Sequence, residues 1–252
     1  MSFTRACVFL LVVFSLILGA CASKNHVSQE YQESLRGRTE RTSKRTVLLF
    51  LIDGLPVSTL QEQLEARRLP NIKNYFQAHS QRIYLARTPF PSLTFPGIGS
   101  PLTEKPLDQN GLYGNLVLQD GEPLNLESPA NYLKLNQMIK GDNVFARLRA
   151  KGLKTVSIDY GFRADTDASM DANDSEAALA ILNKDYARVD GKLIESLRSL
   201  LSDTYTSRWP DFIFVHLIGV DFLSHDFGPK SQEVAKYLRF LDQELGSTLK
   251  AL

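Results

Sequence analysis

The stretch that decides the fold is VLLFLIDG, Val47–Gly54, an apolar run that stops at an acidic residue followed by glycine. Apolar and polar residues do not alternate within Val47–Ile52, which is typical of a parallel strand with both faces buried. We therefore predict such a strand over Val47–Ile52, with Asp53 at its carboxyl end.

Strand and helix patterns alternate along the rest of the chain. The other expected strands are 82–86, which has the weaker pattern, 155–159 and 211–217. The expected helices are 56–68, 143–152, 192–202 and one that begins near Gln232. This alternation predicts an α/β fold with a mostly parallel sheet and helices on both faces. Ligands bind such sheets beyond the carboxyl ends of the strands, which is where Asp53 lies.

The composition is that of an ordinary globular protein, with 43% hydrophobic and 23% charged residues. A chain of 252 residues can bury a sizeable core, and we place one domain at 46–252. A net charge of +1 gives no argument for a nucleic-acid partner.

Residues 1–20 have the pattern of an export signal. Arg5 supplies a positive charge, and the apolar run Ala6–Leu18 is shorter than the roughly 20 residues that a bilayer span needs. The run ends in LGAC, Leu18–Cys21, which resembles a bacterial lipobox. This resemblance implies a lipid on Cys21 and, because no Asp follows it, a place at the outer membrane facing the periplasm. An ordinary secretory signal is the alternative.

Residues 21–45 are polar and basic, and their apolar residues do not recur at the spacing of a helix or a strand. We therefore predict a tether rather than a folded element. Cleavage of the signal would remove Cys7 and leave Cys21 as the remaining cysteine. The mature chain would then form no internal disulfide and offer no cysteine metal site.

Acidic and imidazole side chains lie in or after two of the predicted strands. Asp53 ends an apolar strand, where a carboxylate is costly without a cationic partner, although a helix cap or a turn is the alternative. Asp221 and His225 are four residues apart, so on a helix they could share a metal ion. The alternative is a solvated surface pair. His216 lies inside an apolar strand, and we expect it in the core or behind the ligands rather than on a metal.

The segment FPSLTFPGIGSPLTEKPLDQNGLYGN, Phe90–Asn115, fits neither the helical nor the strand period. A surface loop is one interpretation. However, Pro96 suits the first turn of a helix, which would place Thr94 near an N-terminus that favours phosphate. A Thr hydroxyl becomes a nucleophile when a metal helps to remove its proton, and Ser92 is the rival nucleophile.

Four motifs in this order resemble those of the nucleotide pyrophosphatase/phosphodiesterase branch of the alkaline phosphatase superfamily: LLFLIDGL, PSLTFPG, GLYGN and GVDFLSHDFGP. The resemblance implies an α/β/α core, two zinc ions around a phosphate site, and a phosphodiester or nucleotide substrate. It assigns Asp53 and Thr94 to one metal, with Thr94 as the nucleophile, and Asp221 and His225 to the other. Asn115 matches the residue that hydrogen-bonds a phosphate oxygen.

The sequence departs from this family pattern in two places. Asn110-Gly111 stands where relatives have His-Gly. The chain also ends before the Asp-His pair and the distal His that complete the family's metal sites. We therefore expect a C-terminally truncated member with half the protein ligands of each metal, whose final helix covers a sheet that lacks a strand. A non-catalytic lipoprotein that binds a ligand is the alternative to a hydrolase.

Overall fold

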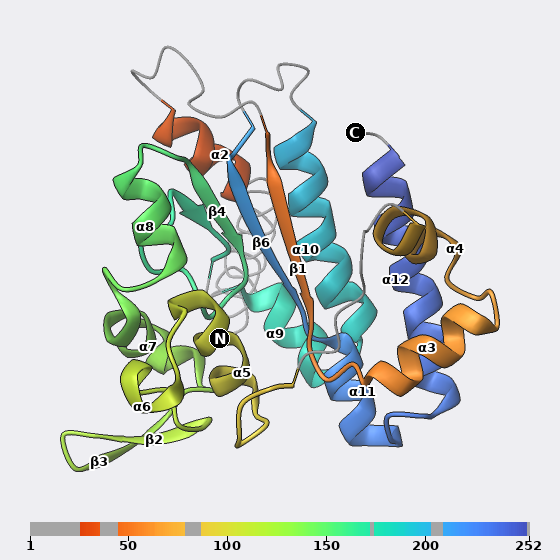
Figure 1. Cartoon of the computed structure of the whole chain (residues 1–252), viewed down its shortest axis with the longest axis horizontal. Coiled ribbons are helices and arrows are strands. Elements are labelled where there is room, and N and C mark those ends of the chain that lie inside the picture. Colours follow the sequence, from red (N-terminus) through yellow and green to blue (C-terminus); the bar gives the residue numbers. More distant parts are fainter. Residues whose placement is uncertain (1–25, 36–44, 79–86, 172–173, 203–208, 251–252) are drawn as a thin grey trace, which may run out of the picture.

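The structure is a computed structural model that describes residues 26–35, 45–78, 87–171, 174–202 and 209–250 (Figure 1). The predicted signal peptide, Cys21 and the expected strand 82–86 lie outside these ranges. The strands are β1 Val47–Ile52, β2 Leu116–Gln119, β3 Glu122–Asn125, β4 Thr155–Ile158, β5 Ala168–Ser169 and β6 Phe212–Leu217. The helices are α2 His26–Ser34, α3 Val57–Glu65, α4 Pro70–Ile72, α5 Thr94–Thr103, α6 Leu107–Asn110, α7 Tyr132–Ile139, α8 Val144–Ala150, α9 Ser175–Leu182, α10 Tyr186–Leu201, α11 Gly219–Phe227 and α12 Gln232–Lys250. A π-helical turn at Lys73–Ala78 and a 3₁₀ turn at Pro129–Asn131 complete the set.

Four strands form one parallel sheet in the order β1-β6-β4-β5. In the register between β1 and β6, Val47 pairs with Phe212 and Ile52 with Leu217. β2 and β3 form a separate antiparallel hairpin. The predicted α/β class with a mostly parallel sheet is confirmed, and the strands expected at 47–52, 155–159 and 211–217 are present.

Helices cover both faces of this sheet, as expected. Ile213 and Val215 of β6 pack with α2, α10, α11 and α12 on one face. Phe212 and Phe214 pack with α5, α7 and α8 on the other. Figure 1 shows α7 and α8 on one side of the sheet and α10 and α12 on the other. Burial on both faces explains why β6 is apolar at successive positions.

β1 departs from the prediction of burial on both faces. It is the edge strand of the described sheet, and Val47 and Leu49 are 55% and 41% exposed. Leu48, Phe50 and Ile52, which point the other way, pack against the core. The helices that bury Phe212 and Phe214 on this face of the sheet leave Val47 and Leu49 of the edge strand exposed. A continuous apolar run therefore did not guarantee two buried faces.

The predicted tether is wrong for His26–Ser34, because these residues form helix α2 against β5 and α10. Val27 and Tyr31 lie four residues apart on one face and are 2% and 1% exposed. Glu30 also accepts a hydrogen bond from the backbone N–H of Ser169 at 2.7 Å. Only two apolar residues, Val27 and Tyr31, mark the buried face of this helix, and two positions are too few to reveal a helical repeat in a polar segment.

The segment Phe90–Asn115 is more regular than its composition suggested. Helix α5 begins at Thr94, as the position of Pro96 indicated, and continues through Pro101 to Thr103. α6 follows, and Asn110 is buried at its end, where its side chain accepts a hydrogen bond from Leu112 N. The surface-loop interpretation is therefore wrong for most of this segment.

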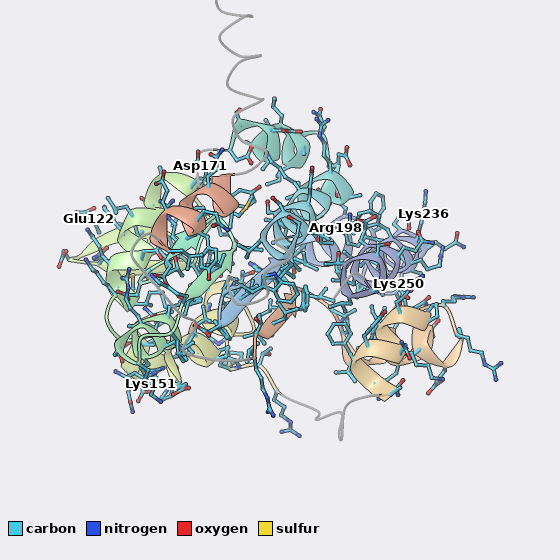
Figure 2. All side chains as sticks on the ribbon, turned by 90° about the horizontal axis from the view of Figure 1, so that it is seen from above. Glu122, Lys151, Asp171, Arg198, Lys236 and Lys250 are labelled. Carbon is cyan, nitrogen blue, oxygen red and sulfur yellow. The ribbon has the colours of Figure 1, made fainter. Side chains whose placement is uncertain are left out.

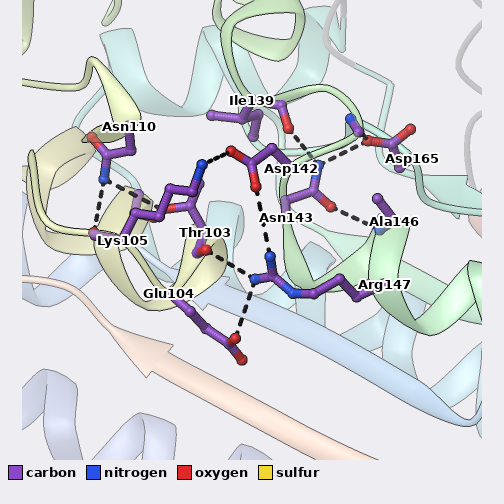
Figure 3. A network of polar contacts seen from close by, with 12 residues as sticks. Thr103, Glu104, Lys105, Asn110, Ile139, Asp142, Asn143, Ala146, Arg147 and Asp165 are labelled. Carbon is purple, nitrogen blue, oxygen red and sulfur yellow. Dashed lines mark hydrogen bonds and ion pairs between the residues drawn. The ribbon is translucent and has the colours of Figure 1, made fainter.

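The C-terminal end of α5 is tied to α8 by the polar network in Figure 3. Arg147 donates to the carbonyl of Thr103 at 2.9 Å and pairs with Glu104 and Asp142. Lys105 also pairs with Asp142. These contacts anchor the helix that carries Thr94 at its other end.

The final helix is well covered in the described structure. Its apolar stripe, Val234, Leu238, Leu241 and Leu245, is at most 2% exposed and packs with α4, α10 and α11. Arg198 of α10 reaches across to Glu244 and Thr248 of α12. The stripe belongs to the same core cluster as Ile213 and Val215 of β6, so it covers the sheet as expected, and the neighbouring helices complete its burial.

Charged side chains such as Glu122, Lys151 and Lys236 project outward at the rim (Figure 2). Within the described ranges, no helix has both the length and the apolarity to cross a bilayer.

Candidate functional site

Three polar side chains form a row at the carboxyl edge of the sheet. Asp53 follows β1, His216 is the penultimate residue of β6, and Asp159 follows β4. Because side chains alternate along a strand and these three strands are neighbours, all three point to the face covered by α5. His216 Nδ1 lies 3.0 Å from Asp159 Oδ1, and its Nε2 lies 3.4 Å from Asp53 Oδ2.

This row favours a positive charge at its centre. Burial would lower the pKa of His216, but the nearby carboxylates of Asp159 and Asp53 raise this pKa to about 10. Burial would raise the pKa of Asp53, yet His216 and a hydrogen bond with the Thr94 side chain lower it below its usual value. A positive charge between the two carboxylates, carried by the ring or by a bound ion, offsets the cost of burying them.

Asp221 lies directly beside the turn that carries Asp53. A Cβ built on Gly54 would be 2.5 Å from the Cα of Asp221, so only glycine allows this approach of β1 to α11. Burial and the charge of Asp53 both raise the pKa of Asp221. Asp53 and Asp221 lie on the same side of the sheet edge, and their mutual repulsion would be relieved by a bound cation.

His225 is one helical turn beyond Asp221. Its Nε2 lies 3.7 Å from Asp221 Oδ2, and its side chain is 80% exposed. The two residues therefore share one face of α11, as their spacing predicted.

Helix α11 is held in place by the buried carboxylate of Asp190, which accepts hydrogen bonds from the backbone N–H groups of Ile218 and Gly219 at 3.0 and 3.1 Å. The Tyr237 hydroxyl also donates to Asp190 at 2.5 Å. A Cβ on Gly219 would collide with that hydroxyl. Asp190 thereby fixes the start of the helix that presents Asp221.

Thr94 is the first residue of α5 and is partly buried, with its side chain hydrogen-bonded to Asp53. The N-terminus of α5 places a partial positive charge beside it. Of the first N–H groups of this helix, Phe95 N donates to Asn115 and Gly97 N donates to the carbonyl of Leu93, while Pro96 has no N–H. Ser92 is exposed and instead pairs with the Thr88 hydroxyl at 2.8 Å. The structure therefore brings Thr94, not Ser92, to the carboxyl edge of the sheet.

Asn115 lies at the same helix terminus. Its Oδ1 accepts from Phe95 N at 3.2 Å, and its Nδ2 donates to Glu127 at 2.7 Å. The structure thus joins Asn115 to the start of α5, although they are distant in sequence.

Sequence reasoning missed Asp159 and Glu127. Asp159 had a usable signal, because it ends a predicted strand just as Asp53 does. Glu127 had none, since it follows the β2–β3 hairpin and reaches Asn115 only through the fold.

The donor set suits zinc, which takes carboxylate oxygen and imidazole nitrogen. Asp221 with His225 is one pair of such donors, and Asp53, beside the hydroxyl of Thr94, is a further carboxylate. Within the ranges described above, however, no group of three or more His, Cys, Asp or Glu side chains is gathered closely enough to hold a metal ion.

The fold is shared with two solved structures. Phosphonoacetate hydrolase from Sinorhizobium meliloti in complex with phosphonoformate is 18% identical with a TM-score of 0.59, over 85% of this chain and 55% of that one. Murine ectonucleotide pyrophosphatase/phosphodiesterase 5 is 15% identical with a TM-score of 0.62, over 82% of this chain and 52% of that one. The chain thus spans about half the length of these relatives.

A comparison with curated protein sequences finds no significant match. The family model described as type I phosphodiesterase / nucleotide pyrophosphatase matches residues 47–252, which cover all of the described sheet. The resemblance inferred from the four motifs is confirmed, and the chain belongs to the type I phosphodiesterase / nucleotide pyrophosphatase family.

Proposed function

We propose that this chain hydrolyses phosphodiester or pyrophosphate bonds with Thr94 as the nucleophile and two zinc ions in the site. The observation that carries the proposal is the meeting of Thr94, Asp53 and Asn115 at the N-terminus of α5. One helix terminus thereby offers a hydroxyl, a carboxylate that orients it, the side-chain amide of Asn115 as a donor for a phosphate, and the partial positive charge of the helix.

Each residue has a defined task in this reaction. The Thr94 hydroxyl loses its proton to solvent, and its oxygen attacks phosphorus as the bond from phosphorus to the ester oxygen breaks. The leaving oxygen takes a proton from water, and a second water then cleaves the bond between phosphorus and Thr94 and returns a proton to the Thr94 oxygen. Asp53 orients the hydroxyl, but its low pKa makes it a weak base. Asn115 Nδ2 turns from Glu127 to a phosphate oxygen, beside the N-terminus of α5.

The metals belong on the two donor pairs, Asp53 with Thr94 and Asp221 with His225. Bound zinc would supply positive charge, which would favour deprotonation of the Thr94 hydroxyl and stabilise the negative charge on the phosphate oxygens. Burial and, after it, the charge of Asp53 raise the pKa of Asp221, and a cation bound at this position would offset both effects.

Zinc-dependent turnover tests the proposal. The purified chain, stripped with a chelator, should hydrolyse bis(4-nitrophenyl) phosphate only after zinc is restored. The same assay with 4-nitrophenyl phosphate and phosphonoacetate establishes whether diesters are preferred, since a structural neighbour is named for phosphonoacetate. Zinc binding without hydrolysis of any of the three substrates would instead favour the non-catalytic, ligand-binding alternative.

We further propose that the chain is an exported lipoprotein, held at the outer membrane by lipid on Cys21. The support is the sequence LGAC at the end of the apolar run Ala6–Leu18. Cys21→Ala should stop lipid attachment, which a mass shift of the N-terminal peptide measures, and should release the protein from membranes. If this variant fractionates and matures as the wild type does, the proposal is wrong.

A further inference from the structure

His216 has one ring nitrogen with a clear partner and one without. Its side chain is 6% exposed, so the ring has little contact with bulk solvent. Nδ1 is bound to Asp159 at 3.0 Å, whereas Nε2 has no hydrogen-bond partner although it is fully buried. A buried polar atom without a partner is costly and calls for a ligand or an ion.

The position of Nε2 fits a metal ligand. It lies 3.4 Å from Asp53 Oδ2, outside the geometry of a good hydrogen bond. Two ligand atoms of a tetrahedral zinc, each about 2.0–2.2 Å from the ion, lie about 3.3–3.6 Å apart. The separation between Nε2 and Oδ2 therefore equals the edge of a zinc coordination tetrahedron.

The other ring nitrogen, Nδ1, is hydrogen-bonded to a carboxylate, as is usual in metal-binding histidines. An ionised carboxylate only accepts hydrogen bonds, so Asp159 holds the proton on Nδ1. The Nε2 lone pair is then directed toward Asp53, and the ring is fixed in one orientation. Asp159 is itself fixed by the backbone N–H of Phe162, which donates to its other oxygen.

We propose that His216 Nε2 is a ligand of the metal ion held by Asp53 and Thr94. This inference rests on the proposed function and deepens it, because it supplies a third protein ligand to that ion from within the described residues. Three protein ligands and one open position are the usual set for a catalytic zinc. The sequence placed His216 in the core, where the structure has it, and expected it not to bind the metal; this proposal differs from the second expectation.

The competing arrangement keeps a proton on Nε2, so that an imidazolium ion forms an ion pair with Asp53. The two arrangements differ in what is bonded to Nε2, and NMR can observe this directly. The chain contains four histidines, so a sample labelled with ¹⁵N in histidine gives few resonances to assign.

The test is to load the full chain with ¹¹³Cd in place of zinc and record the histidine ¹⁵N spectrum, with His216→Gln and His225→Gln used for assignment. We expect scalar coupling to ¹¹³Cd at His216 Nε2 as well as at His225. Coupling at His225 alone, with a proton on His216 Nε2, would overturn this proposal and leave the proposed metal site standing. Absence of coupling at both would overturn the proposed metal site itself.

Affinity measurements with matched variants add a second readout. Asp159→Asn should weaken zinc binding by about 10–100-fold through the ring orientation, and His216→Gln should weaken it further. The control is Asp167→Asn, which alters a buried carboxylate bound to Lys154 and Thr155 at the amino end of β4. Equal zinc affinity in Asp159→Asn and Asp167→Asn would count against the proposal. If His216→Gln does not fold, the wild-type ¹¹³Cd spectrum still decides.

Discussion

Thr94→Ala is expected to reduce kcat for a phosphodiester by about 10³-fold or more, because it removes the attacking oxygen. The residue follows an extended Leu93 at the start of α5, so the change removes a hydroxyl without altering the helix. Steady-state hydrolysis of bis(4-nitrophenyl) phosphate in saturating zinc measures the effect.

Ser92→Ala is the matched control for this experiment. Ser92 lies two residues away, is exposed, and its hydroxyl pairs with the Thr88 hydroxyl on the surface. Its loss should change kcat less than about threefold, as for an ordinary surface substitution. If Ser92→Ala abolishes turnover while Thr94→Ala retains it, the assignment of the nucleophile is wrong.

Gly54→Ala is expected to destabilise the fold by about 2–5 kcal/mol, from a left-handed backbone and from overpacking. Gly54 has φ +65°, and its added Cβ would lie 2.5 Å from the backbone Cα of Asp221. Backbone cannot move aside as a flexible side chain does, so α11 must shift away from β1. This shift separates Asp221 from Asp53 and should weaken zinc binding as well.

Gly121→Ala separates the two contributions. Gly121 has φ +85°, but nothing lies within 4 Å of the position that an added Cβ would take, so this variant carries only the conformational cost of about 1–2 kcal/mol. Urea unfolding and zinc titration of both variants make the comparison. Equal losses of stability, with unchanged zinc affinity in Gly54→Ala, would show that the approach of Gly54 to Asp221 does not position the site.

The sequence by itself determined three strands of the main sheet and the starts of two helices. A helix was expected from residue 143, and Asn143 caps α8 there by accepting the hydrogen bond from Ala146 N. Pro96 predicted a helix start near Thr94, and α5 begins at that residue. These features depend on φ preferences and on side-chain bonds to backbone a few residues away, so a short stretch of chain contains all the necessary information.

The tertiary structure alone decided which strands are neighbours. Period and composition report whether a side chain faces in or out, but they do not name the strand beside it. The order β1-β6-β4 places His216 between Asp53 and Asp159, and it leaves β1 at the edge with Val47 and Leu49 exposed.

Helix α2 also depends on the tertiary structure. Its two apolar residues are buried only when β5 and α10 pack against them. The contacts that give His216 and Asp190 their roles join residues far apart in the chain, so only the packed fold brings these polar groups together.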